Sequence, residues 1–178
     1  MANKASPVLD EFSVTETEVS VDYDSKIAGC IPVVAGVGLL NDDDEVENVS
    51  SATVVIMPDS CTDVDSGLRI ADEVGANLYN VWEALVLNKI SLEDHDFSCT
   101  IVVEETSGES ASLTKRALAL ALHAAGGSRG ALILANDFSA DEEILTELGF
   151  VNHRGVYISD TRMLAQYDAL MVAAGLNE

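Results

Sequence analysis

Basic residues are scarce in this chain. Its 178 residues include nine Lys and Arg against 31 Asp and Glu, which gives a formal net charge of −22. Proteins that bind nucleic acid neutralise phosphates with Lys and Arg, and contact with an anionic membrane needs the same side chains. The composition therefore predicts that neither a nucleic acid nor a membrane surface is a partner.

Cysteines are few, and long apolar runs and a signal peptide are missing. Cys30, Cys61 and Cys99 are odd in number and far apart, and no C-x-x-C pair occurs, so we expect neither a disulfide framework nor a zinc site. The longest apolar candidates, Ile27 to Leu40 and Ala117 to Ala125, are too short to span a bilayer. The first residues lack the basic then apolar order of a signal peptide. These features predict a soluble protein of the cytoplasm or of a virion rather than a secreted one.

Hydrophobic residues, in contrast, are plentiful. They make up 48% of the chain, and the mean hydropathy is +0.20. Disordered chains combine high charge with low hydrophobicity, so this composition predicts a compact fold with a sizeable core. The acidic excess has two interpretations. One is adaptation to high salt, where a Debye length of about 3 Å at 1 M screens self-repulsion, and the other is a place in a large assembly whose partners or cations offset it.

Residues 1–50 differ in pattern from the rest of the chain. Every second residue from Val19 to Tyr23 is apolar, which is typical of a half-buried strand. The apolar run from Ile27 to Leu40 is broken by glycines and a proline. We predict an extended N-terminal β arm with one or two strands, followed by an acidic loop from Asn41 to Glu47.

Residues 51–178 alternate between strand and helix patterns. We expect strands at 53–57, 99–103, 131–134 and 156–158, and helices at 68–85, 110–125, 139–148 and 161–174. Thr62 or Asp63 is a suitable cap for the first helix, and Ser139 with Glu142 matches a capping box for the third. This order predicts an α/β (or α+β) domain with a mixed, mostly parallel sheet flanked by helices.

One part of this alternation carries a recognisable series of motifs. In chain order these are Thr100-Ile-Val-Val103, Gly108-Glu-Ser110-Ala-Ser112, a helix to Ala125, the segment Ala131 to Asn136, Leu148-Gly149-Phe150 and Val156 to Ile158. Residues from about 99 to 159 thereby resemble the C-terminal half of a GNAT-type N-acetyltransferase. In that family a strand leads through a Gly-rich pyrophosphate loop into a helix, and a strand, a short helix and a closing strand follow.

The resemblance implies a site for acetyl-CoA at the start of the second helix. A helix N-terminus offers unpaired N–H groups to a pyrophosphate, and a glycine lets the backbone approach it. Backbone N–H groups near Val103 and Glu104 would then hold the acetyl carbonyl. The candidate cofactor-binding residues that follow from the resemblance are Val103, Glu104, Gly108, Ser110, Ser112 and Asn136.

The sequence departs from the family where the chemistry would take place. The carboxylates of Glu104, Glu105 and Glu109 crowd the pyrophosphate position, and like charges repel. Ser107 stands at the position of the usual leading Arg or Gln, and Leu145 at that of the Tyr that acts as general acid. An aliphatic side chain cannot transfer a proton. We therefore predict a fold of this type without its catalysis.

Acidic residues near position 60 resemble the opening of a calcium loop. Asp63 and Asp65 precede Gly67, and the twelfth position counted from Asp63 is Val74 rather than the Glu that such a loop needs. We interpret this cluster as a solvated loop or a helix cap, and predict no metal site.

These observations predict a non-catalytic structural or assembly protein that acts through protein–protein contacts, without a cofactor. Strands that cannot bury both faces alone commonly pair with a neighbouring subunit, so we expect a homo-oligomer or larger assembly through the N-terminal arm. A capsid- or tail-associated virion subunit is one version of this prediction. The alternatives are an acetyl-CoA-dependent N-acetyltransferase and a halophilic, doubly wound α/β binding domain unrelated to that family.

Overall fold

The computed structural model describes residues 14–22, 27–40, 46–61, 63–92, 99–108, 110–127 and 130–176. A seven-stranded sheet runs through them in the order β1-β2-β3-β4-β5-β7-β6. Its strands are β1 (Val14–Val21), β2 (Ile31–Leu40), β3 (Val46–Ile56), β4 (Cys99–Gly108), β5 (Ala131–Asn136), β6 (Val151–His153) and β7 (Val156–Asp160). The helices are α1 (Val64–Val74), α2 (Ala76–Asn88), α3 (Ala111–Ala124), α4 (Glu142–Glu147) and α5 (Leu164–Ala174).

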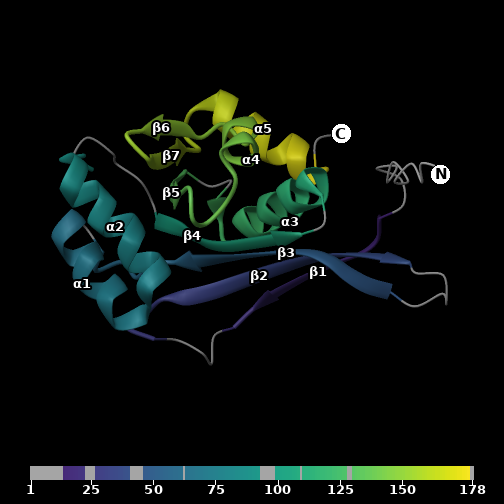
Figure 1. The fold of residues 1–178 in the computed structure, drawn as a ribbon, viewed down its shortest axis with the longest axis horizontal. Coiled ribbons are helices and arrows are strands. Elements are labelled where there is room, and N and C mark those ends of the chain that lie inside the picture. Colours follow the sequence, from purple (N-terminus) through teal and green to yellow (C-terminus); the bar gives the residue numbers. More distant parts are fainter. Residues whose placement is uncertain are drawn as a thin grey trace, which may run out of the picture.

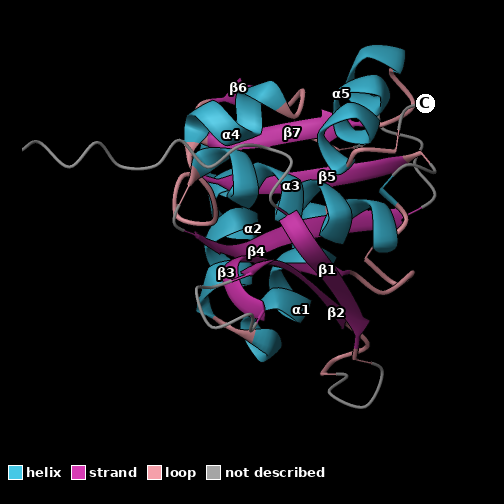
Figure 2. Cartoon of the chain, turned by 90° about the vertical axis from the view of Figure 1, so that its right-hand side faces the viewer, coloured by secondary structure: helices cyan, strands magenta, loops and turns pink. Residues whose placement is uncertain are grey.

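Helices cover both faces of the sheet (Figure 1). One face packs against α3, α4 and α5 in the main core, which includes Val37, Leu118 and Ile133. The other face packs against α1 and α2 in a second core that contains Trp82 and Val102. Figure 2 shows that the sheet is twisted, so that β1 runs at a steep angle to β5 and β7. Among the described residues, no helix combines the length and the apolar character needed to cross a membrane.

The α/β class and the mixed sheet flanked by helices are confirmed, but the expectation of a mostly parallel sheet is wrong. Only β4 and β5 run parallel within the described sheet, from the pair Cys99 and Ala131 to the pair Val102 and Leu134. Every other neighbouring pair is antiparallel. Short runs of buried apolar residues look alike in parallel and antiparallel strands, so the sequence pattern does not reveal strand direction.

The N-terminal part contributes more strand than the sequence predicts. β1, β2 and β3 form an antiparallel meander, and β3 begins at Val46, inside the expected acidic loop. Because β3 runs through position 50, the strands of the predicted arm and the α/β part share one sheet. Residues 1–13, 23–26 and 41–45 of the predicted arm and loop lie outside the described residues.

The single helix expected over 68–85 is two helices. Gly75 lies between α1 and α2 with an extended backbone, which ends one helix before the next begins. The predicted cap at Asp63 is confirmed, since its carboxylate accepts a hydrogen bond from the Ser66 N–H at 2.7 Å. Thr62 lies outside the described residues. A Cβ atom on Gly67 would lie 2.3 Å from the Trp82 ring, so the absence of a side chain in α1 lets α2 pack closely.

The C-terminal elements follow the predicted order with one correction and one addition. The N-cap of α4 is Asp141 rather than Ser139, whose hydroxyl bonds to Asn136 instead. The predicted last strand has an additional partner that the sequence did not indicate, because β6 and β7 form a hairpin with positive φ angles at Arg154 and Gly155.

Candidate functional site

The predicted coenzyme site lies where β4 separates from β5. Parallel pairing ends at Val102 and Leu134, while β4 continues to Gly108 along β3. The register with β3 shifts within this stretch, because Val103 pairs with Val54 and Glu105 pairs with Thr53. Glu104 is therefore the extra residue of a β-bulge, a feature that bends a strand and redirects its side chains.

The carboxylate at this bulge is in a poor environment for a second negative charge. Burial raises the pKa of Glu104 above its ordinary value, and the neighbouring Glu105 carboxylate raises it further. Both effects disfavour the charged form of Glu104. Binding of an anionic ligand at the bulge would be disfavoured for the same two reasons, because the ligand would lose solvation and would be repelled by the Glu105 carboxylate.

Gly108 and Ser110 have structural roles at the start of α3. Gly108 was expected in a loop, but it is the last residue of β4 and pairs with Ser50. A Cβ atom there would lie 2.3 Å from both Ser50 Oγ and Thr114 Oγ1, which bond to each other at 3.1 Å. Ser110 is the N-cap of α3, and its hydroxyl accepts a hydrogen bond from the Leu113 N–H at 3.2 Å.

The Asn136 side chain likewise forms hydrogen bonds within its own turn. Its Oδ1 atom accepts hydrogen bonds from the backbone N–H groups of Phe138 and Ser139, each at 3.0 Å, and from the Ser139 hydroxyl at 3.0 Å. Thr106 Oγ1 donates to the Ser139 carbonyl oxygen at 2.9 Å. This bond ties the end of β4 to the turn after β5, across the gap between the two strands.

The six predicted residues do not share any hollow that the described residues form. Gly108 lines a hollow of about 260 Å³ between the end of β4 and the turn after β5. Ser112 lines a different hollow, of about 330 Å³, between α3 and α5. In that hollow Lys115 forms an ion pair with Glu147 at 2.6 Å. Val103 is fully buried in the main core.

A second surface of interest is the edge of the sheet formed by β1. Among the described residues β1 pairs only with β2, and the side chains from Thr17 to Ser20 are exposed. The Asp22 N–H donates to the Pro32 carbonyl oxygen at 3.1 Å, so the backbone of Asp22 faces β2. Backbone direction alternates along a strand. The N–H and C=O groups of Thr17, Val19 and Val21 therefore point away from the sheet.

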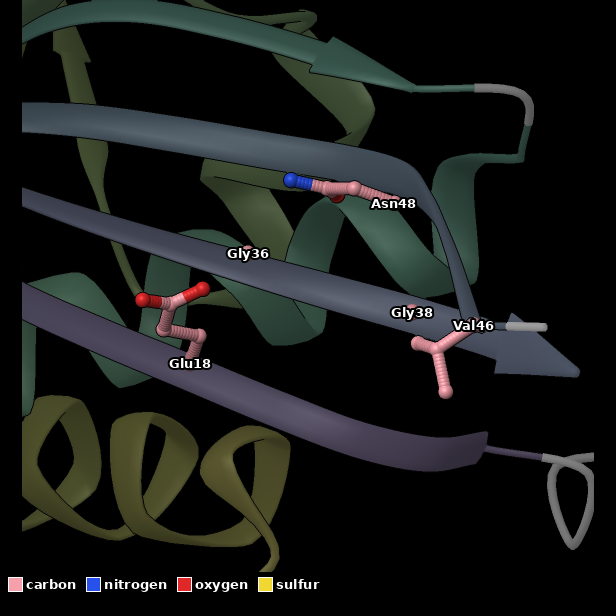
Figure 3. A pocket seen from close by; sticks show the side chains of 5 residues that line it. All are labelled: Glu18, Gly36, Gly38, Val46 and Asn48. Atoms are coloured by element: carbon pink, nitrogen blue, oxygen red, sulfur yellow. The ribbon is translucent and has the colours of Figure 1, made fainter.

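A hollow of about 170 Å³ lies beside this edge, on the face of the sheet turned away from α3 (Figure 3). Gly36 and Gly38 of β2 form its floor, Glu18 comes from β1, and Val46 and Asn48 come from β3. A Cβ atom on Gly36 would lie 2.8 Å from Asn48 Nδ2. The Asn48 amide therefore leaves no space for a side chain at Gly36. Because glycine has no side chain, the β2 backbone at Gly36 and Gly38 is accessible from this face.

The sequence did not single out Phe138, which is the most exposed of the large hydrophobic side chains described, at 84%. The turn held by Asn136 presents it at the rim of the hollow near β4. Its one sequence signal is an aromatic residue within a polar turn, Asn136-Asp-Phe-Ser139.

The two buried thiols, those of Cys30 and Cys61, are held in the core. The Cys30 thiol donates to Met57 Sδ at 3.9 Å, and burial raises the pKa of Cys30 to about 11 and that of Cys61 to about 12. Both thiols stay protonated at neutral pH, which is typical of inert core cysteines. In the seven described stretches, no three His, Cys, Asp or Glu side chains gather to hold a metal ion.

No family model, curated protein or solved structure matches this chain.

Proposed function

We propose that this chain is a non-catalytic structural protein that assembles with other subunits through the edge of its sheet at β1. The observation that carries the proposal is the outward side of β1, which pairs with no strand among the described residues and presents the backbone groups of Thr17, Val19 and Val21. In Figure 1, β1 and β2 lie at the opposite end of the sheet from β6 and β7.

An open strand edge is a ready template for another strand, and proteins that remain monomeric usually protect it with charged side chains, especially Lys, or with Pro, a strong bulge or a covering element. β1 contains neither Lys nor Pro, and its register with β2 is regular from Glu16 to Val21. The other edge strand, β6, is only three residues long. The two edges thus differ, and β1 is the one suited to strand addition.

The exposed carboxylate of Glu18 on β1 makes this edge sensitive to ionic strength. Repulsion between exposed charges is screened over about 8 Å in physiological salt and about 3 Å in 1 M salt. A protein of net charge −22 that pairs through an acidic strand should therefore assemble more readily as salt is added.

The non-catalytic part of the proposal is supported by what the candidate residues already do. Gly108 permits close packing against Ser50 and Thr114 because it has no side chain. Ser110 caps a helix, and Asn136 stabilises a turn. Glu104 and Glu105 add two carboxylates at the point where a pyrophosphate or thioester would have to approach.

Replacing Thr17 by proline tests the proposal by sedimentation in molar salt. Thr17→Pro removes an outward N–H group, whereas Thr17→Ala leaves every backbone group in place and serves as the matched control. We expect the wild type and Thr17→Ala to sediment as oligomers and Thr17→Pro to shift towards the single chain, with at least a tenfold weaker association. Equal association of all three variants would remove β1 from the interface.

The second candidate function is that of an acetyl-CoA-dependent N-acetyltransferase. The observation that favours it is the separation of β4 from β5 after Val102, next to a helix that begins at Ala111. In this candidate function, backbone groups near Val103 and Glu104, which follow the last described pair of β4 and β5, would contact an acetyl carbonyl. Calorimetry with acetyl-CoA at low and at molar salt distinguishes the candidates. Micromolar binding that strengthens in Glu105→Gln would support the enzyme.

A further inference from the structure

We propose that the partner of β1 is a second copy of this chain, paired antiparallel about a two-fold axis at Val19. This inference rests on the proposed function, and it adds the identity of the partner and the register of the pairing. It would join two seven-stranded sheets into one continuous sheet, with the same residues used on both sides, as a two-fold interface requires.

The register follows from the outward backbone groups of β1. Thr17, Val19 and Val21 face outward, and Val19 is the middle of the three. With the axis at Val19, each Val19 exchanges two hydrogen bonds with its copy, and Thr17 does the same with Val21 of the second copy. Antiparallel strands form two N–H···O bonds at each such pair, so about six bonds close the interface. The irregularity between Val14 and Glu16 falls outside this stretch.

The side chains on the face towards α3 favour this register. Val19 is paired with Ala35 of β2 and is 41% exposed, whereas Val21 is half-buried and packs against the main core. A second β1 would place Val19 opposite Val19, and Thr17 opposite Val21. Cross-strand pairs of β-branched residues are stabilising, and these pairs would extend the main core across the axis.

The side chains on the opposite face select against the neighbouring registers. With the axis at Val19, Glu18 lies opposite Ser20 of the second copy, which avoids contact between carboxylates. An axis at Glu18 places Glu18 opposite Glu18 of the second copy. An axis at Thr17 places Glu18 opposite Glu16, and an axis at Ser20 places Glu18 opposite Asp22. Like charges directly opposite each other are destabilising.

The selected register leaves one unfavourable pair, Glu16 opposite Asp22, at each end of the interface. These pairs lie at the ends of the paired stretch, far from the axis, and added salt screens the repulsion between their charges. The dimer should therefore be weak in low salt and stable in molar salt, which agrees with the acidic composition of the chain.

A mixed cross-linking experiment tests the register. Glu18 and Ser20 are exposed residues of β1, and in this register they form a non-hydrogen-bonded pair with Cα atoms about 4.5 Å apart, which is within the range that a disulfide spans. Glu18→Cys and Ser20→Cys are made separately in a Cys99→Ser background. Each variant, and an equal mixture of the two, is exposed to oxidised glutathione in molar salt and run on a non-reducing gel.

We expect the mixture to give at least five times more covalent dimer than either variant alone. The background protein without the added cysteine is the control for the buried Cys30 and Cys61. A strong cross-link in Glu18→Cys alone would place the axis at Glu18, and one in Ser20→Cys alone would place it at Ser20. Either result overturns the proposed register.

Light scattering on the same samples separates this inference from the proposed function. A dimer that gives no preferred cross-link in the mixture contradicts the β1 register but leaves assembly standing. A single-chain mass at every salt concentration contradicts both the register and the assembly. If the single chain instead bound an unrelated basic protein through β1, the partner would be a different protein rather than a second copy.

Discussion

The glycine at position 108, near the predicted coenzyme site, can be explained in two ways. Gly108 sits where a Cβ atom would lie 2.3 Å from two hydroxyl oxygens, those of Ser50 and Thr114. A backbone that must approach a phosphate and a backbone that must approach a side chain both require glycine. The structure shows the second requirement, which makes Gly108 a determinant of packing between β3, β4 and α3.

Gly108→Ala should lower the free energy of unfolding by about 1–3 kcal/mol, the range typical of overpacking a tight contact. Gly75→Ala is the matched control, since no atom lies within 4 Å of a Cβ atom there and its φ angle of 165° is extended. Urea unfolding followed by Trp82 fluorescence measures both variants. Equal stability of Gly108→Ala and the wild type would show that the hydroxyls of Ser50 and Thr114 move aside freely.

Glu104 leads to a prediction about pH. Burial raises its pKa in the folded state, and Glu105 adds to the shift, so the folded protein binds a proton more tightly than the unfolded chain. Stability then falls as the pH rises from the ordinary pKa of Glu through the raised folded value, and the cost persists at higher pH. Glu104→Gln should therefore be more stable than the wild type at pH 7.5 and gain less at pH 4.

Glu105→Gln is the control for this pH dependence, because Glu105 is exposed. It should show a smaller gain at pH 7.5, through the loss of its repulsion with Glu104. Urea unfolding of both variants at the two pH values measures the difference. The assignment fails if Glu104→Gln is less stable than the wild type at pH 7.5.

At the scale of elements, the outward and inward residues of β1 make a prediction about stability. Ser20 alternates with the outward residues, so its N–H group faces Val34 of β2. Ser20→Pro should remove a ladder bond and cost about 1–3 kcal/mol of folding free energy. Thr17→Pro should cost much less in the monomer, because its outward N–H group has no ladder partner among the described residues. Urea unfolding in low salt compares the two, and an equal loss in both would contradict the assigned direction.

The order of elements in the C-terminal part could be predicted from the sequence, because apolar spacing and capping residues are local signals. The positions of α3 and β5 and the cap at Asp63 follow from such signals. The split between α1 and α2 could not be predicted, since the apolar spacing continues across Gly75 without a break. Strand direction also could not be predicted, because it depends on how α1 and α2 return the chain from β3 to β4.

The side-chain contacts around the candidate site could not be predicted from the sequence. The motifs around Gly108 and Asn136 bring their residues to the same end of the sheet, but side-chain contacts with Ser50, Thr114 and Ser139 decide what those residues do. Such contacts join residues far apart in the chain, so no local pattern reports them. The bulge at Glu104 is a further example, because it appears only when the register against Thr53 and Val54 is known.

At the scale of the whole molecule, the net charge of −22 sets the conditions under which assembly can occur. Bringing two copies together through an acidic strand edge adds their repulsion, and mobile ions offset it. High-salt adaptation and assembly are therefore compatible for this chain, since both place the protein where its charge is screened. In the described sheet, one edge strand is the eight-residue β1 and the other is the three-residue β6.

The most direct test of the central claim is the molar mass of the wild-type chain, measured by light scattering from low to molar sodium chloride. The account predicts the mass of one chain in low salt and at least twice that mass in molar salt, with Thr17→Pro remaining nearer the single-chain mass. A wild-type mass of one chain throughout the salt range would contradict assembly through β1.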